Sequence, residues 1–266
     1  MGHSRLSASE SGRWINCPGS IRSIAELEEN RAIKPDRSSD AAMEGTAAHT
    51  LCEVCLEDML AGGWYISADK YKGCKIYVDP TGDGSIMFCQ GETGNKDWSV
   101  FEVDDDMILA VDVLLHHVRE VLESFGANED GIPLDVDVEI EAYANLGFLG
   151  REDLGGRIDV RITQLMGDMH VIDYKHGRGV PVDPELNTQL MIYGLGDNCK
   201  EDMQPGDAIL TIVQPRCPKN ESVASWRIPV PDLQLWAAEV LVPAAEATDD
   251  PDSPCIPCLL YTSPSP

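Results

Sequence analysis

The segment from Asp104 to Phe125 has the clearest amphipathic pattern in the chain. Its apolar positions, spaced three or four residues apart, are Met107, Val111, Leu114, Val118, Val121 and Phe125. This spacing places them on one face of a helix, while an acidic first turn and Gly126 mark the two ends. We therefore predict a helix over residues 104–125 that buries one face against the rest of the protein.

The segment from Leu134 to Ala142 alternates strictly between apolar and acidic residues, which is typical of a strand with one buried face. Its apolar side consists of Val136, Val138 and Ile140, and its acidic side of Asp135, Asp137, Glu139 and Glu141. We interpret the acidic side as a solvated face, although Glu139 or Glu141 could reach a metal ion bound nearby.

Further helices and strands are predicted from the remaining apolar runs and their boundary residues. Ser38-Ser39-Asp40 precedes a helix that runs to Leu60, and Asp183-Pro184 resembles a second helix start, because Asp caps helices and Pro suits their first position. A last helix runs from Asp232 to about Leu241, and Pro243 marks its end or a kink. Strands are predicted over 155–160, 169–172, 208–213 and 225–230, with a hairpin made of 74–78, a turn at 79–84, and 85–89.

This succession of elements predicts a mixed α/β fold in a single domain over residues 1–248, with a β-hairpin insertion at 63–103. With 266 residues, 43% of them hydrophobic, the chain can bury a substantial core. Residues 249–266 are acidic and then rich in Pro and Ser, which is typical of disordered segments. Because no apolar run approaches the length of a membrane helix and no hydrophobic signal segment opens the chain, we expect a cytoplasmic protein.

Asp173 and Lys175 end a short apolar strand and share one of its faces, since residues two apart in a strand point the same way. Taken alone, the pair could be an exposed ion pair on an edge strand. Asp159, however, comes from a second short strand upstream. Two strands that each deliver an acid, one with a lysine beside it, indicate a metal-dependent phosphodiesterase site.

Two predicted helices add polar residues to this pattern. His49 follows a string of small residues, Gly45 to Ala48, which would let its helix approach a sheet closely, although a lone helix histidine is usually not a ligand. Gln189 and Tyr193 lie four residues apart and therefore share one face of the helix after Asp173.

Together these residues resemble the RecB-like branch of the PD-(D/E)xK nuclease superfamily. The four motifs of that branch occur here in order, as Gly45…His49, Gly156…Asp159, Asp173…Lys175 and Gln189…Tyr193. The strings Trp14 to Ser20 and Glu44 to His49 are also similar to a phage-encoded family of this branch that is uncharacterised or described as exonucleases. The resemblance implies a restriction-endonuclease-like core, with a central mixed β-sheet flanked by helices.

The resemblance also implies roles for the motif residues. His49, Asp159, Asp173 and the backbone carbonyl of Tyr174 would ligate Mg²⁺ or Mn²⁺. Lys175 would orient the attacking water or neutralise charge in the transition state, and Gln189 and Tyr193 would brace the site or touch the DNA. The implied function is a metal-dependent DNA exonuclease used in phage recombination or DNA processing in the host cytoplasm, with DNA and a phage single-strand annealing protein as partners. A catalytically idle DNA-binding or assembly subunit is the alternative.

The formal charge of −26, from 46 acidic and 20 basic residues, stands against DNA binding, because phosphate contacts usually require a basic surface. A local basic concentration surrounds the motif residues and consists of Arg151, Arg157, Arg161, Lys175 and Arg178. Of these we expect Arg157 and Arg178 to contact DNA. A partner or a salty habitat could also account for the acidic surplus.

The nine cysteines are too sparse and irregular for a disulfide scaffold, which predicts a reduced compartment. Some RecB-like nucleases hold a [4Fe–4S] cluster with one cysteine before the nuclease motifs and three near the C-terminus. Cys17 matches the first position, but only Cys255 and Cys258 are present at the other end. Residues 258–266 resemble translated sequencing-adapter read-through, so we expect the cluster only in the intact protein and Cys17 far from Cys255 in this chain.

Overall fold

The computed structural model describes residues 4–30, 39–81, 84–89, 97–196, 206–219 and 221–256, and its centre is a mixed six-stranded sheet. The strands follow the order β1-β6-β7-β8-β9, and β5 also pairs with β6. The pairs β1–β6 and β7–β8 are parallel and the others antiparallel. The strand bounds are β1 (Leu6–Ser7), β5 (Val136–Asn145), β6 (Leu154–Gln164), β7 (Met169–Tyr174), β8 (Asp207–Val213) and β9 (Val223–Pro229).

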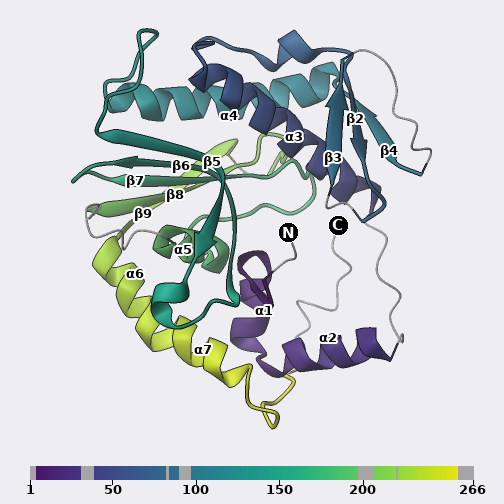
Figure 1. The fold of residues 1–266 in the computed structure, drawn as a ribbon, viewed down its shortest axis with the longest axis vertical. Coiled ribbons are helices and arrows are strands. Elements are labelled where there is room, and N and C mark those ends of the chain that lie inside the picture. Colours follow the sequence, from purple (N-terminus) through teal and green to yellow (C-terminus); the bar gives the residue numbers. More distant parts are fainter. Residues whose placement is uncertain are drawn as a thin grey trace.

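Helices cover both faces of this sheet, as Figure 1 shows. On one face lie α3 (Asp40–Leu60) and α4 (Asp105–Ser124), and on the other α1 (Ser11–Asn16), α5 (Thr188–Leu195), α6 (Val230–Trp236) and α7 (Val242–Ala247). Each side has its own hydrophobic core, which we call the α3–α4 core and the α5–α7 core. The expected α/β fold with a central mixed sheet and flanking helices is confirmed. Among the described residues, no helix has the length and apolarity that a membrane crossing requires.

The two long helices begin where their capping residues predict. The Ser39 hydroxyl accepts a hydrogen bond from the backbone N–H of Ala42 at 3.2 Å, and the Asp104 carboxylate accepts one from the N–H of Met107 at 2.9 Å. Such caps satisfy backbone donors that have no partner within the first turn of a helix. In α3 and α4, a short polar side chain before an apolar periodic run therefore marks the helix start.

The predicted helix start at Asp183-Pro184 is wrong, since α5 begins only at Thr188. Leu186 has a positive φ of 55° and an exposed side chain, so the chain turns there before it becomes helical. The cap is Asn187, whose side chain accepts hydrogen bonds from the N–H groups of Gln189 and Leu190. Pro243 lies in the first turn of α7, after a short π-helix (Ala237–Leu241), so it marks a junction between helices rather than an end.

A smaller three-stranded sheet packs against α3, in the order β3-β2-β4. The predicted hairpin is formed by β2 (Lys75–Val78) and β3 (Ser85–Phe88), whereas β4 (Ser99–Glu102) was not anticipated. Residues 82–83 of the predicted turn lie outside the described residues. Antiparallel pairing of β2 with β3 brings Cys74 and Cys89 together, and they form a disulfide, so the expectation of reduced cysteines is wrong for this pair.

The large sheet bends where β5 and β6 cross from one core to the other. Ile140 and Val160 pack in the α3–α4 core, whereas Ala144 and Ile158 belong to the α5–α7 core. In a regular strand the even-numbered residues would share one face, so both strands switch faces between these positions. Glu141 stands at the switch with a left-handed φ of 52°, between the paired residues Ile140–Val160 and Ala142–Ile158 that also flank Asp159 of β6.

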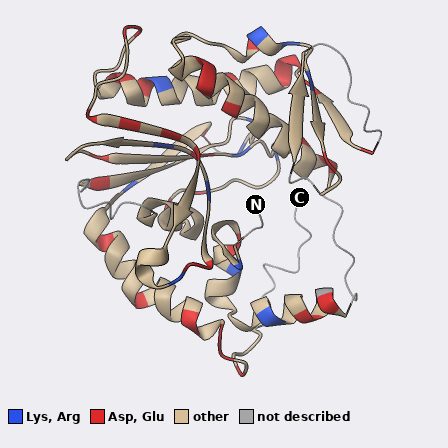
Figure 2. Cartoon of the chain, viewed as in Figure 1, with Lys and Arg blue, Asp and Glu red and all other residues tan. Residues whose placement is uncertain are grey.

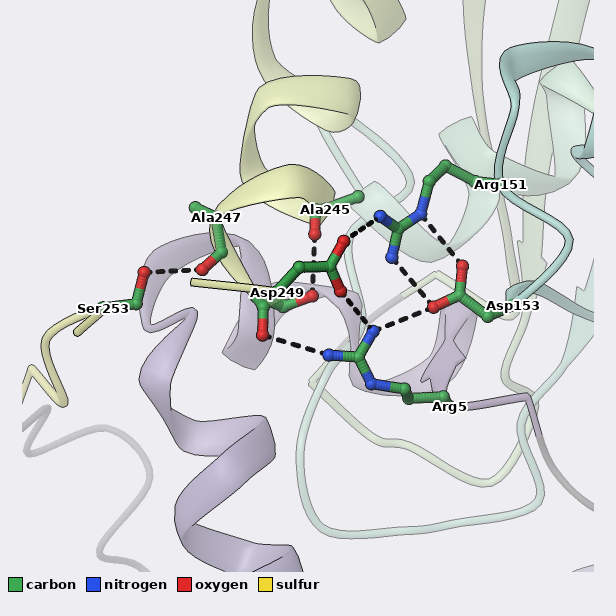
Figure 3. A network of polar contacts seen from close by, with 8 residues as sticks. Arg5, Arg151, Asp153, Ala245, Ala247, Asp249 and Ser253 are labelled. Atoms are coloured by element: carbon green, nitrogen blue, oxygen red, sulfur yellow. Dashed lines mark hydrogen bonds and ion pairs between the residues drawn. The ribbon is translucent and has the colours of Figure 1, made fainter. Parts of the chain in front are cut away.

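The residues around Asp249 close the fold by joining the two ends of the described chain, as Figure 3 shows. The Asp249 carboxylate pairs with Arg5 at 2.7 Å and with Arg151 at 2.5 Å, while Arg5 and Arg151 both contact Asp153. Ser253 is buried and donates to the carbonyl of Ala247 at 2.5 Å. The predicted disorder of 249–266 is therefore wrong for residues 249–256, and residues 257–266 lie outside the described part of the chain.

Candidate metal centre

Three side chains converge at the bend of the large sheet. They are His49 from the middle of α3, Glu141 from β5 and Asp159 from β6. One ligand atom from each lies within 4.8 Å of those of the other two. His49 Nδ1 is 3.3 Å from Asp159 Oδ1, and all three side chains are only partly exposed. One imidazole and two carboxylates at this separation form a donor set suited to a hard divalent cation.

The electrostatics of these groups reflect their crowding. Burial alone would lower the pKa of His49, but the neighbouring Asp159 carboxylate raises it to about 9. Burial and the nearby Asp159 charge raise the pKa of Glu141 to about 7. Burial would also raise the pKa of Asp159, but the His49 charge outweighs it and lowers that pKa. Without a cation, the imidazolium of His49 therefore balances part of the carboxylate charge.

Asp173 and Lys175 form an ion pair beside this cluster, with Lys175 Nζ 2.8 Å from Asp173 Oδ2. Asp173 is 3% exposed, and burial raises its pKa, although Lys175 opposes this shift. Burial lowers the pKa of Lys175, but the Asp173 charge outweighs it and raises the pKa. The cluster of His49, Asp159 and a third acid thus contains Glu141, while the Asp173 carboxylate lies beside it and pairs with Lys175.

Gln189 connects this ion pair to α5. Its amide nitrogen donates to the Tyr193 hydroxyl at 3.0 Å and to Asp173 Oδ1 at 3.3 Å, and its amide oxygen accepts from Lys175 Nζ at 3.3 Å. The two helix residues therefore share one face, as their spacing predicts. Gly156 leaves room for the Tyr193 ring, because a Cβ on Gly156 would lie 2.9 Å from Tyr193 Cε1.

Tyr174 lies between Asp173 and Lys175 on β7 and contacts the His49–Glu141–Asp159 cluster. Its backbone N–H donates to Asp159 Oδ2 at 2.7 Å, and its ring meets the His49 ring edge-on with centroids 5.5 Å apart. The Tyr174 hydroxyl lies 2.7 Å from Nδ1 of the buried His176. Burial, with a contribution from the nearby Arg216 charge, lowers the pKa of His176 to about 3, so this imidazole is neutral where it shares a hydrogen bond with the Tyr174 hydroxyl.

The arginines around the site are paired with acids rather than gathered into a basic surface. Arg157 lies 3.4 Å from Glu141, Arg178 pairs with Asp106, and the buried Arg161 binds Glu139 and the carbonyl of Gly196. Figure 2 shows acidic positions spread along the outer helices α2 (Gly19–Glu29), α4, α6 and α7, with few basic ones between them. The expected basic concentration is therefore largely neutralised within the described residues.

Cys17 lies close to the C-terminal end of the described chain and contacts the segment that contains Cys255. The Cys17 sulfur accepts a hydrogen bond from the N–H of Ile256 at 3.1 Å, and Ser23 Oγ lies 2.8 Å from Cys255 Sγ. The expectation that Cys17 lies far from this segment is wrong. Cys258 lies outside the described residues. The described residues around Cys17 therefore do not supply the four thiolates that a [4Fe–4S] cluster requires.

Residues 3–258 match the model of a family described as "Protein of unknown function (DUF2800)". The chain belongs to the DUF2800 family. Among solved structures, this DUF2800 protein is similar to one titled "Crystal structure of SSO0001", with 20% identity and a TM-score of 0.27. That match covers 56% of the present chain and 63% of the other, so the DUF2800 protein spans less than two thirds of that relative's length.

The sequence pattern singled out most of the residues that meet at the centre of this DUF2800 protein, but it gave Glu141 no fixed place there. The alternation of β5 assigned Glu141 to the same face as Glu139, whereas the bend turns it toward Asp159. The sequence pattern also missed three polar residues that meet beside the site: Glu44 Oε1 lies 3.6 Å from His176 Nε2 and 3.0 Å from Arg216 Nη1. The one signal for His176 was its place directly after Lys175, and nothing in that stretch of sequence revealed its hydrogen bond to Tyr174.

Proposed function

We propose that this protein is a Mg²⁺- or Mn²⁺-dependent deoxyribonuclease of the PD-(D/E)xK type, acting as an exonuclease in phage recombination or DNA processing. The supporting observation is the convergence of His49, Glu141 and Asp159 within 4.8 Å, beside the Asp173–Lys175 pair. A cation site next to a positioned lysine provides what phosphodiester hydrolysis requires, namely charge neutralisation around phosphorus and an activated water.

The donor set fits the proposed cation. His49, Glu141 and Asp159 would hold it, with Asp173 and the Tyr174 carbonyl as further candidates from the adjoining strand. When bound, the ion would lower the pKa of a water molecule and stabilise negative charge on the phosphoryl oxygens. His49 would then have to release its proton, because only a neutral imidazole nitrogen can be a ligand.

The remaining residues would prepare the site for a phosphate group. Lys175 provides a compact positive charge, and Asp173 and Gln189 fix the position of its ammonium group. Tyr193 in turn holds the Gln189 amide. Because these groups are oriented before substrate arrives, little reorganisation is needed when charge develops on the reacting phosphate.

Incubation of the purified protein with end-labelled linear DNA and closed circular DNA, in Mg²⁺, Mn²⁺ or EDTA, tests this function. We expect loss of label from linear DNA in either cation and none in EDTA, while circular DNA stays intact. Cutting of the circle would indicate an endonuclease. Binding of DNA without cleavage in either cation would favour the idle DNA-binding or assembly subunit, and a phage single-strand annealing protein would then be a partner to test.

A further inference from the structure

A cavity of about 450 Å³ lies on the α4 side of the metal centre and contains two arginines from different loops. Arg178 follows β7 and Arg216 follows β8, and the carboxylate of Asp106 on α4 contacts both. The lining consists of Asp106, Leu109, Val113, Arg178, Arg216 and Ser222, among others. A volume of this size is within the range of small-molecule sites.

The Asp106 carboxylate lies between the two guanidinium groups and pairs with both. Arg216 Nη2 lies 3.0 Å from Asp106 Oδ2, and Arg178 contacts the same oxygen. Two guanidinium groups that converge on one carboxylate also suit a phosphate, because arginine binds both anions through charge-assisted hydrogen bonds. The side chain of Asp106 is 53% exposed, so solvent and a competing anion can reach it.

The rest of the structure encloses Arg216, whereas Arg178 is largely exposed to solvent. Arg216 has a side chain only 9% exposed, and its Nη1 lies 3.0 Å from Glu44, on the same helix as His49. Arg178 is 62% exposed and lies three residues after Lys175, so its Cα is within about 10 Å of that of Lys175. A strand held at the metal centre would therefore extend to this cavity within a few nucleotides.

We propose that Arg178 and Arg216 form a phosphate subsite for the DNA strand next to the reacting phosphate, and that Asp106 occupies it in the free protein. This inference rests on the proposed function. Binding a strand would exchange the Asp106 carboxylate for a phosphodiester oxygen on the same two arginines. The exchange lets an acidic protein hold its basic residues in place without presenting a free basic surface to other anions.

The test compares Asp106→Asn with a matched control, Asp105→Asn. Both residues lie in the first turn of α4 and both substitutions remove one negative charge, but Asp105 pairs with Lys72 instead of the two arginines. Binding of a fluorescent dT12 strand is measured by anisotropy in Ca²⁺ buffer over a series of salt concentrations. We expect Asp106→Asn to tighten binding roughly three- to tenfold, because the strand no longer displaces a carboxylate from the two arginines and the net gain resembles that of one ordinary hydrogen bond. Asp105→Asn should change binding less than about twofold.

A double variant shows whether the gain acts through the proposed subsite. Adding Arg178→Ala to Asp106→Asn should abolish the gain, and the salt dependence should lose about 0.7 from its logarithmic slope, the value of one single-strand phosphate contact. Equal effects of the two Asp variants, or a gain that persists without Arg178, would overturn the subsite while leaving the nuclease proposal intact. If Asp106→Asn tightened the binding of thymidine 5′-monophosphate as much as that of dT12, the assignment of this subsite to a DNA strand would be overturned. Absence of DNA binding and cleavage in the wild type would overturn both proposals.

Discussion

Replacing Glu141 by Gln is expected to stabilise the metal-free protein and weaken its response to divalent cations. Glu141 and Asp159 present oxygens within 4.8 Å of each other, and at pH 8 both carry charge because the pKa of Glu141 is about 7. Two like charges at that distance repel by about 3 kcal/mol at an effective dielectric constant near 20. Loss of the attraction to His49 and to the exposed Arg157 offsets part of this, so we expect a net gain of about 1–2 kcal/mol.

Thermal unfolding at pH 8 measures both effects. In a chain of this length about 1 kcal/mol corresponds to roughly 2 °C, so Glu141→Gln should raise Tm in EDTA by about 2–4 °C. A cation at one hundred times its Kd stabilises the wild type by about 2.7 kcal/mol, which corresponds to roughly 5 °C. If the variant binds at least tenfold more weakly, that cation-induced shift should fall to about half or less.

Asp137→Asn serves as the control, because Asp137 is an exposed acid on the same strand. It should leave Tm in EDTA within about 1 °C of the wild type and keep the full cation-induced shift. A lower Tm for Glu141→Gln in EDTA would contradict the repulsion argument. An unchanged cation-induced shift would remove Glu141 from the metal centre.

Four further outcomes are expected. Asp173→Asn should abolish DNA cleavage in the end-label assay while circular dichroism shows an intact fold, and unchanged turnover would exclude Asp173 from the site. Lys175→Ala should lower kcat by roughly 10²–10³ with cation affinity preserved, and Lys175→Arg should rescue poorly because its planar fork differs from an ammonium; loss of cation binding would indicate a structural role. Burial lowers the pKa of His170 to about 4, so on acidification the unfolded state binds a proton at this residue before the folded state does. The free energy of unfolding should therefore fall as pH drops from 6.5 to 4, by at most about 3 kcal/mol. His170→Leu should make the free energy of unfolding in urea depend less on pH over that window, and an unchanged dependence would refute this. The protein should purify colourless, because the described residues around Cys17 do not supply four thiolates, and a brown preparation with absorbance near 400 nm would show a cluster.

Local patterns predicted those elements whose boundaries are set by nearby residues. The helices α3 and α4 begin at the caps Ser39 and Asp104, and each cap acts within one turn. The predicted start of α5 was wrong because Asp183-Pro184 has the composition of a helix start, while the left-handed φ of the exposed Leu186 is a conformation that its residue type does not indicate. Strand β4 was missed because its pairing with β2 is a contact between distant segments.

The same distinction holds for the candidate site. Motif order indicated His49, Asp159, Asp173 and Lys175, and the structure brings these side chains into one region. The place of Glu141 depends on a bend shared by two strands, which alternation along a single strand cannot reveal. The acids that neutralise the arginines also come from other elements, so counting charges along the chain overestimated the basic character of this region.

The bend in β5 and β6 makes the metal centre sensitive to packing at a distance. Glu141 and Asp159 stand where the sheet passes from the α3–α4 core to the α5–α7 core, so the distance between their carboxylates depends on how both cores are filled. A substitution such as Ile158→Val or Val160→Ala touches no ligand, yet it would shift one side of the bend relative to the other. Evolution could therefore tune the preference for a smaller or larger cation through buried aliphatic residues alone, leaving every coordinating side chain unchanged.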